Sequence, residues 1–400
     1  MSTIQRYNNE LNFIYFSPTK IIYGKGSIKE IPLEMENHNK KKAVIVTDKF
    51  LYENHKKVKE CIELLGKKCC YIYYDVPPDS SLETVNSLYN KIKELNVDTV
   101  ISIGGGSVID TGKAIAILLK EGGRIEDHLG FQSLSRPQTF HIAVPTTAGT
   151  GSEVTKYIVL KDTEKGQKLI IGENYVIPNI AILDPELTLT LPPKLTASTA
   201  IDALSHCIES LHSLQSQPIS DGLALYGIEL IFNYLPKVLK EPNSLHYRGQ
   251  LQIAATLGGI AFDNAQVGLV HAFAHVIGAK FNIHHGVAIG VMLPYVIKFN
   301  SVEKRCEEIY KRILLNLGIE RTGTKIEQNP TNLVKRLKEF IKGVGLPTTL
   351  KELNIKKESI EDIAESTLYD PSIVYNGRYA MEKELLIEIL KEAYDGGEPL

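Results

Sequence analysis

The first half of the chain alternates short apolar, mostly β-branched runs with helical patterns of apolar and polar positions. The runs that predict strands are 43–47, 71–74, 99–103, 140–144 and 180–183. Between them, 54–66, 82–95 and 107–120 carry apolar residues three and four positions apart, which is typical of helices packed on a sheet. Strands that alternate with helices predict a parallel sheet and an α/β fold. The opening segment, 13–24, is predicted to be a hairpin around Ser17-Pro18.

The pattern changes after Asp184-Pro185, because the β-branched runs disappear and long helical patterns continue to the C-terminus. The proline pair Pro192-Pro193 falls at this change, and prolines suit a stiff connector or the first turn of a helix. We therefore predict two domains: an α/β domain at 1–189 and an all-α domain at 190–400.

Composition narrows the possible partners. The net charge is −2, from 45 basic and 47 acidic residues spread along the chain, so no basic surface is expected to follow a nucleic acid backbone. The N-terminus lacks a secretory signal, and the longest apolar stretch, 287–299, is shorter than the ~20 residues of a membrane span. Five cysteines without a Cys-x-x-Cys pair fit reduced thiols. These features predict a cytoplasmic protein with neither nucleic acid nor membrane as a partner.

Gly104-Gly105-Gly106-Ser107 directly follows a predicted strand and opens a helical pattern that contains Asp110. Small residues let backbone N–H groups approach a pyrophosphate, and the helix N-terminus adds partial positive charge. The alternative is a plain strand-to-helix turn, because the run is not G-x-G-x-x-G.

A second predicted phosphate or ribose loop, 145–153, also follows a strand and contains four hydroxyl side chains and two glycines. Asp48 follows the first strand of the alternating region. A carboxylate there can accept both ribose hydroxyls and would repel a 2′-phosphate, which favours NAD over NADP. The alternative for Asp48 is an ordinary helix cap.

The helical half concentrates potential metal ligands. Asp202 and His206 are four residues apart, so their side chains lie on one helix face. Five of the eleven histidines lie at 206 or within 271–285, the later ones being His271, His275, His284 and His285. Together they predict a metal site rather than a set of core histidines.

A continuous helix would place His285 ~21 Å from His271, so both can bind one ion only if the helix ends between them. Gly278 and Asn282 permit such a break. Aspartate and histidine ligands without a thiolate suit Fe²⁺, Zn²⁺, Mn²⁺ or Co²⁺. Four protein ligands on a five- or six-coordinate ion would leave room for a substrate oxygen.

Together, the glycine loop with Asp110, the 145–153 loop, Asp202 to His206, and 271–286 resemble the iron-containing (group III) alcohol dehydrogenase family over nearly the whole chain. The resemblance implies a Rossmann-like N-terminal domain, a helical C-terminal domain as in dehydroquinate synthase, and a cleft between them for cofactor and metal. The metal ligands that it implies are Asp202, His206, His271 and His285.

The resemblance also assigns cofactor contacts and a catalytic histidine. It places His275 near the substrate, where we expect it to relay a proton, and Phe262 near the nicotinamide. The cofactor-binding residues that it implies are Asp48, Gly105, Gly106, Ser107, Asp110, Thr146, Thr147, Thr150, Lys168 and Leu187.

This chain departs from the family pattern at two places. Pro77-Pro78-Asp79-Ser80 stands where many relatives have Pro-Asn-Pro, which affects one predicted adenine or ribose contact. Asn376-Gly377-Arg378 stands where relatives often have Asn-Pro-Arg, and we expect a looser loop there.

The resulting hypothesis is a metal-dependent NAD(H) alcohol dehydrogenase, with Fe²⁺ expected and Zn²⁺ or another divalent metal as alternatives. The expected substrate is a small primary alcohol, diol or aldehyde, and the expected assembly is a homo-oligomer, a dimer or larger. The alternatives are a polyol dehydrogenase, a hydroxyacid-oxoacid transhydrogenase or a dehydroquinate-synthase-like lyase on the same scaffold, and a nonredox metal-binding protein or hydrolase.

Overall fold

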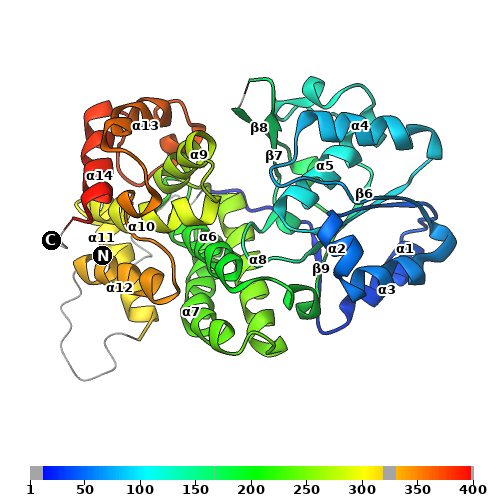
Figure 1. The fold of residues 1–400 in the computed structure, drawn as a ribbon, viewed down its shortest axis with the longest axis horizontal. Coiled ribbons are helices and arrows are strands. Elements are labelled where there is room, and N and C mark those ends of the chain that lie inside the picture. Colours follow the sequence, from blue (N-terminus) through cyan, green and yellow to red (C-terminus); the bar gives the residue numbers. More distant parts are fainter. Residues whose placement is uncertain (1–11, 166, 319–329, 398–400) are drawn as a thin grey trace. The chain divides into compact units, whose positions relative to one another are not determined.

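A computed structural model describes residues 12–165, 167–318 and 330–397, and it divides into two compact units (Figure 1). The sheet unit comprises Ser17–Pro192 and Glu241–Gly259. The helical unit comprises Met1–Phe16, Pro193–Lys240 and Ile260–Leu400.

The sheet unit is built on six parallel strands in the order β1-β9-β6-β4-β2-β3. Their bounds are β1 Lys20–Tyr23, β2 Ala43–Val46, β3 Cys69–Tyr73, β4 Thr99–Gly104, β6 Phe140–Pro145 and β9 Ile180–Leu183. The four inner strands are buried along their whole length, as expected for a parallel sheet covered on both faces. The sequence prediction of a parallel α/β sheet is therefore confirmed.

Helices cover both faces of this sheet (Figure 1). Their bounds are α1 Ile31–Asn37, α2 Lys49–Asn54, α3 Lys56–Leu65, α4 Leu82–Ile92 and α5 Gly106–Glu121. Alternate strand residues enter different cores: Val44 and Val46 pack with α4 and α5, whereas Ala43 and Ile45 pack with α1 and α3.

Two features of the sheet unit differ from the sequence prediction. Residues 13–24 do not form a hairpin, because β1 pairs in parallel with β9 and the described residues before it form no strand. A small second sheet in the order β5-β8-β7 was not predicted. Its strands are β5 Gly130–Phe131, β7 Tyr157–Asp162 and β8 Gln167–Gly172, and their mixed burial gave no uniform apolar run.

The rest of the described chain is helical. Its helices are α6 Pro193–His212, α7 Pro218–Lys240, α8 Leu245–Ala265, α9 Leu269–Phe281, α10 His285–Asn300, α11 Lys304–Asn316, α12 Pro330–Gly343, α13 Ile360–Thr367 and α14 Lys383–Asp395. Helix α6 begins at Pro193, the second residue of the proline pair. No single described helix is both long and apolar enough to cross a membrane; only α8 and α9 taken together across their break reach that length and composition.

The division at Pro192 lies three residues after the predicted domain boundary, but the sheet unit also includes 241–259 from the helical half. Side chains of α8 connect 241–259 to the strands and loops of the sheet unit. Gln252 Nε2 donates hydrogen bonds to the backbone oxygens of Pro145 and Asp184 at 3.2 and 3.4 Å. Thr256 Oγ1 donates to Glu153 at 2.7 Å.

Candidate metal centre and cofactor-binding loops

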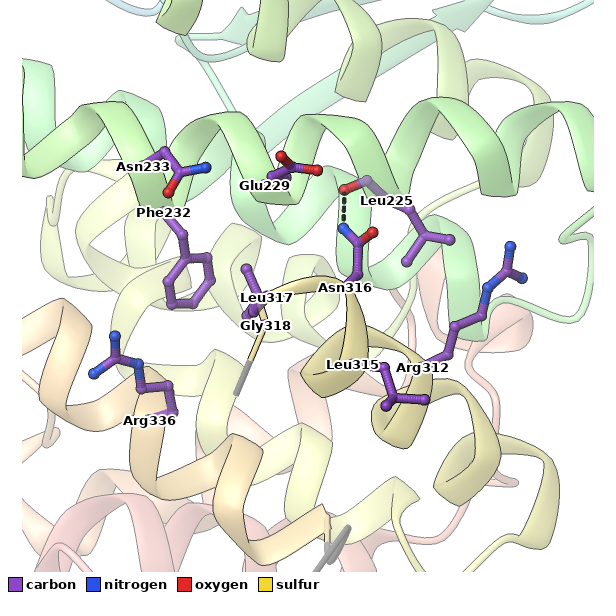
Figure 2. A pocket seen from close by; sticks show the side chains of 10 residues that line it. All are labelled: Leu225, Glu229, Phe232, Asn233, Arg312, Leu315, Asn316, Leu317, Gly318 and Arg336. Carbon is purple, nitrogen blue, oxygen red and sulfur yellow. Dashed lines mark hydrogen bonds between the residues drawn. The ribbon is translucent and has the colours of Figure 1, made fainter. Parts of the chain in front are cut away.

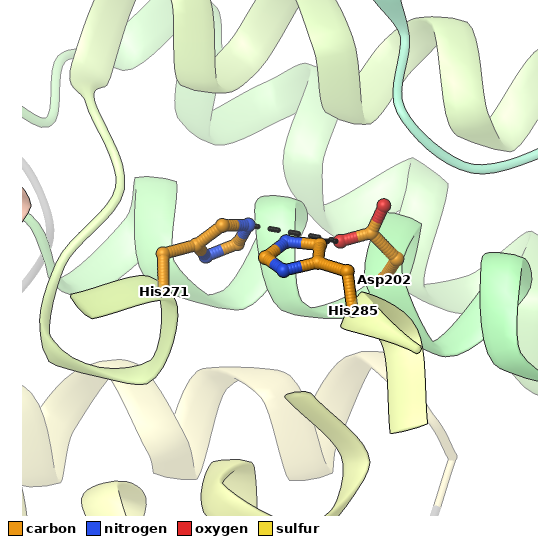
Figure 3. Close-up of side chains that lie close together, drawn as sticks. All are labelled: Asp202, His271 and His285. Carbon is orange, nitrogen blue, oxygen red and sulfur yellow. Dashed lines mark ion pairs between the residues drawn. The ribbon is translucent and has the colours of Figure 1, made fainter. Parts of the chain in front are cut away.

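Three histidine side chains of the helical unit converge on one carboxylate oxygen of Asp202. Asp202 and His206 lie one turn apart on α6, His271 lies on α9, and His285 is the first residue of α10. The Nε2 atoms of His206, His271 and His285 lie 3.7, 3.7 and 3.6 Å from Asp202 Oδ1. Figure 3 shows His271 and His285 beside the aspartate. The structure thus brings together all four predicted ligands.

The predicted break between His271 and His285 is present. Helix α9 ends at Phe281, and Asn282 follows in the left-handed conformation, with φ 52° and ψ 40°. Asparagine tolerates this conformation better than most residues. Gly278, the other candidate for the break, stays inside α9. The reversal at Asn282 returns the chain to the cluster three residues later.

The geometry of these groups fits a divalent cation. Two ligands that bind one ion tetrahedrally at about 2.1 Å are separated by about 3.4 Å, close to the observed Nε2–Oδ1 distances. Asp202 Oδ1 and His271 Nε2 are buried, and neither has a hydrogen-bond partner among the residues that the structure describes. Ligand atoms of Asp202, His271 and His285 all lie within 4.8 Å of one another. His206 is not a member of this three-residue group, but its Nε2 lies beside Asp202 Oδ1.

The charges in the cluster also suit a cation. Burial alone disfavours the Asp202 carboxylate, but His206, His271 and His285 hold its pKa below the ordinary range. Burial favours the neutral His271 ring, but Glu209 and Asp202 outweigh it and raise the pKa of His271 to about 9. The carboxylates of Asp202 and Glu209 therefore make this buried site attractive to positive charge.

Glu209 is a contributor that the sequence analysis did not identify. It is fully buried on α6, three residues after His206, and its carboxylate contacts Nδ1 of His271. The spacing of Asp202, His206 and Glu209, four and then three residues, places them along one helix face. That spacing is the only sign of Glu209 in the sequence.

His275 lies one turn after His271 on α9, and a second unpredicted carboxylate holds it. Its Nδ1 lies 2.8 Å from Asp370 Oδ2, and its ring stacks on His285 with the ring centres 5.3 Å apart. Burial opposes ionisation of Asp370, but the hydrogen bond and charge of His275, with the Ser372 N–H, hold its pKa at about 2. The His275 side chain is 25% exposed, so it is accessible from outside the cluster.

In the sheet unit, the two predicted phosphate loops lie against each other. Gly105 precedes α5 as its N-cap, and the Thr146 N–H donates to the Gly104 carbonyl at 3.0 Å. A Cβ atom at Gly105 would lie 3.3 Å from Thr147 Cγ2, and one at Gly106 would lie 2.8 Å from Thr150 Cγ2. A side chain at Gly106 would therefore force the two loops apart, and one at Gly105 would be tight.

Asp48 and Ser107 lie at the same carboxyl edge of the sheet. Asp48 caps α2, because its Oδ1 accepts a hydrogen bond from the Leu51 N–H at 2.9 Å. Burial raises the pKa of Asp48. Ser107 Oγ accepts from the Asp79 N–H at 3.1 Å. The cap accounts for one Asp48 oxygen, so the cap and the predicted ribose contact are compatible.

Three other predicted cofactor residues have partners within the sheet unit. Asp110 accepts hydrogen bonds from Ser152 Oγ at 2.5 Å and from the Val159 N–H at 2.9 Å. The Leu187 side chain is fully buried in the sheet core. Lys168 pairs with Asp79 at 2.8 Å. Asp110 and Leu187 therefore have clear structural roles, and contact of all three with a cofactor stays a prediction.

The expectation of a looser loop at Gly377 is wrong. The side chains of Asn376 and Asn300 exchange two hydrogen bonds, at 2.8 and 3.1 Å, and Arg378 donates to the Phe299 carbonyl at 2.7 Å. A Cβ atom at Gly377 would lie 2.5 Å from the backbone oxygen of His212. Glycine therefore permits a close contact that a bulkier residue would prevent.

A pocket of about 690 Å³ lies elsewhere in the helical unit, lined by α7, α12 and the end of α11 (Figure 2). Glu229, Arg312 and Arg336 are among its lining residues. None of the predicted site residues lines it, so the pocket is distinct from the candidate metal centre.

Comparison with known proteins covers both units. Residues 18–185 match the model of iron-containing alcohol dehydrogenase, and 196–394 match the C-terminal model of the same family. The NAD-dependent methanol dehydrogenase of Bacillus methanolicus is 33% identical over 381 residues, covering 95% of this chain and 99% of that protein. The NADPH-dependent butanol dehydrogenase of Clostridium saccharobutylicum is 34% identical over 391 residues, covering 95% and 98%.

Among solved structures, the alcohol dehydrogenase from Oenococcus oeni superposes with a TM-score of 0.90 at 32% identity. The match covers 96% of this chain and 100% of that one. The chain belongs to the iron-containing alcohol dehydrogenase family, and its enzyme class is that of the oxidoreductases.

Proposed function

We propose that this protein is a metal-dependent alcohol dehydrogenase and aldehyde reductase that transfers a hydride reversibly between NAD(H) and a small primary alcohol or diol. The observation that carries the proposal is the convergence of three imidazole Nε2 atoms within 3.6–3.7 Å of one Asp202 oxygen. The relatives named for methanol and butanol support a small alcohol as the substrate class.

We assign the metal to Asp202, His206, His271 and His285. Family membership supports Fe²⁺, whereas the nitrogen and oxygen donors would also accept Zn²⁺ or another divalent ion. When bound, the cation supplies Lewis-acid polarisation of the substrate oxygen, and NAD(H) supplies or accepts the hydride.

The protein contributes binding, orientation and a path for the proton. His275 is our candidate for the proton relay, because its ring stacks on His285 and remains partly exposed. Asp370 accepts a hydrogen bond from His275 Nδ1, which orients the ring and leaves Nε2 to exchange the substrate proton with solvent.

The proposed cofactor site consists of the two sheet-unit loops together with Asp48. The backbone N–H groups at the start of α5 suit a pyrophosphate. The Asp48 carboxylate supports NAD(H) over NADP(H), because it would repel a 2′-phosphate. Cofactor preference differs between the two named relatives, so this preference has to be tested in this chain.

We also propose that the protein acts in the cytoplasm as a homo-oligomer, without a nucleic acid or membrane partner. None of the five cysteines, all within the described residues, forms a disulfide, which supports a reducing compartment. The net charge of −2 supports the exclusion of nucleic acid.

The direct test follows NADH absorbance during addition of a panel of short aldehydes to anaerobically purified protein, with and without added Fe²⁺ or Zn²⁺. We expect metal-dependent loss of absorbance for at least one small aldehyde, and a stoichiometric metal content. The Asp202→Ala variant is the matched control, and it should lose both. Absence of any absorbance change with the metal-loaded protein would contradict the proposal.

A further inference from the structure

Glu209 uses both carboxylate oxygens to hold the start of the helix that carries His271. Its Oε1 accepts hydrogen bonds from the backbone N–H groups of Gly268 and Val270, at 3.0 and 2.9 Å. Its Oε2 contacts His271 Nδ1 and accepts from Ser205 Oγ at 3.3 Å. Three of these four contacts therefore reach the first turn of α9 or the residue just before it.

The contacts to Gly268 and Val270 cap α9 from a neighbouring helix. The N-cap residue Gly268 has no side chain to accept the unpaired N–H groups of the first turn. Glu209 supplies that acceptor together with a negative charge, which a helix N-terminus favours. A Cβ atom at Gly268 would lie 3.2 Å from Glu209 Oε1, so the glycine leaves room for the carboxylate.

The third contact determines which ring nitrogen of His271 carries the proton. An ionised carboxylate only accepts hydrogen bonds, so His271 Nδ1 must be the donor. In the neutral ring the lone pair is then on Nε2, the nitrogen that lies 3.7 Å from Asp202 Oδ1. Carboxylates that orient a metal-binding histidine through its other nitrogen act in this way.

We propose that Glu209 is a positioning residue of the metal centre, which keeps His271 protonated at Nδ1 with Nε2 available to the cation and anchors the start of α9. This inference rests on the proposed metal-dependent function. Through Glu209, α6 positions His271 as well as carrying Asp202 and His206 itself.

The test is the Glu209→Gln variant. The amide changes the contact with His271 Nδ1 more than it changes the contacts with the backbone of α9. The glutamine oxygen can still accept from the Gly268 and Val270 N–H groups. Its NH₂ group would instead donate to His271 Nδ1, which places the ring proton on Nε2 and removes the lone pair that binds metal. We expect Zn²⁺ affinity, measured by chelator competition on apo protein, to fall about 10–100-fold.

The matched control is Asp370→Asn, which makes the same chemical change in the other carboxylate–histidine pair, that of Asp370 and His275. His275 is not among the proposed ligands, so Zn²⁺ affinity should stay within about twofold of wild type. A Co²⁺ titration followed by visible absorption supplies a readout of the ligand set. The spectrum should change in Glu209→Gln and remain as in wild type in Asp370→Asn.

The conservative variant Glu209→Asp distinguishes an effect on the Nδ1 proton of His271 from an effect on packing alone. Glu209→Asp keeps the accepting charge, so we expect it to bind Zn²⁺ more tightly than Glu209→Gln. Wild-type Zn²⁺ affinity in Glu209→Gln would overturn the inference. Equal losses of affinity in Glu209→Gln and Glu209→Asp would also overturn it. If wild type itself binds no divalent cation, the proposed function fails, whereas binding that Glu209→Gln leaves unchanged defeats only the role of Glu209.

If Glu209→Gln does not fold, the wild-type protein can be tested directly. Nitrogen-15 NMR of labelled histidines, with His271 assigned by substitution, should show Zn²⁺ bound through Nε2 and a proton on Nδ1. Coordination through Nδ1, or the absence of a proton on Nδ1 in the Zn²⁺-bound protein, would overturn the inference.

Discussion

The backbone oxygen of Ser198 lies only 2.0 Å from the point that a Cβ atom at Gly286 would occupy. Ser198 lies one turn before Asp202 on α6, and Gly286 directly follows His285 at the start of α10. Only glycine lets the two helices approach this closely. The contact therefore sets how near His285 comes to Asp202.

We predict that Gly286→Ala weakens both the fold and the metal site. The added methyl group must push α10 away from α6, which should cost about 1–3 kcal/mol of unfolding free energy or more. Displacement of His285 should also lower Zn²⁺ affinity. Urea unfolding of the apo protein and chelator competition measure the two effects.

The control for this substitution is Gly222→Ala. Gly222 lies inside α7, and a Cβ atom there would meet no described atom within 4 Å. Alanine should stabilise this helix by about 0.5–1 kcal/mol. Unfolding curves of Gly286→Ala that match wild type would show that α10 can shift without cost.

His285→Ala is expected to lose metal and activity together, because it removes a proposed ligand beside Asp202. Metal analysis and the NADH assay measure the two losses. The thermal midpoint should also lose its rise on addition of Zn²⁺, since a ligand stabilises only a protein that binds it. His284→Ala is the neighbouring control and should retain metal. A full metal complement in His285→Ala would remove His285 from the site.

His275→Ala should keep its metal but turn over at least about 100-fold more slowly, since general acid–base groups contribute about that much or more. Its pH–rate profile should change as well. Asp370, with a pKa of about 2, remains ionised across the usual assay range, so it orients His275 without titrating there. An unchanged pH profile in His275→Ala would exclude the proposed proton relay.

Asp48→Asn should shift cofactor preference toward NADP(H). Asparagine keeps the side-chain oxygen that caps α2 but removes the charge that repels a 2′-phosphate. The ratio of kcat/KM for NADPH to that for NADH should rise, while the melting temperature stays near wild type. Asp48→Ala is the comparison, because it also removes the cap and should cost about 1 kcal/mol. An unchanged ratio in Asp48→Asn would contradict the ribose contact.

His141 should make the stability of the protein fall as pH decreases. It is fully buried on β6, where its Nε2 lies 2.6 Å from Ser102 Oγ. Burial, with the nearby Lys113 charge, lowers the pKa of His141 from 6.5 to about 3. The unfolded chain therefore binds a proton more readily than the folded protein between these values, so acid favours unfolding.

At pH 5 the loss attributable to His141 is about 2 kcal/mol relative to neutral pH. The His141→Gln variant lacks this titration, so its stability relative to wild type should improve as pH falls. Urea unfolding at pH 7.5 and pH 5 measures both proteins. A constant difference between them would show that His141 does not titrate as proposed.

Local patterns in the sequence were sufficient to predict five of the six strands of the parallel sheet, the helical second half and the break between His271 and His285. They also placed Gly105 and Asp48 at strand ends. These features depend on neighbouring residues: apolar periodicity determines which face of an element is buried, and an i,i+4 pair shares one helix face. The pairing of Asp202 with His206 therefore follows from their spacing alone.

Only the tertiary structure decided which distant groups meet. Glu209 and His271 are 62 residues apart, and Asp370 and His275 are 95 apart. The close contacts of Gly286 with Ser198 and of Gly377 with His212 could not be predicted from sequence patterns either. Spacing along one helix follows from its fixed geometry, whereas contacts between helices depend on how the whole unit buries its apolar faces. The sequence alone therefore determined the ligand types and their local pairing, and folding decided which carboxylate orients each histidine.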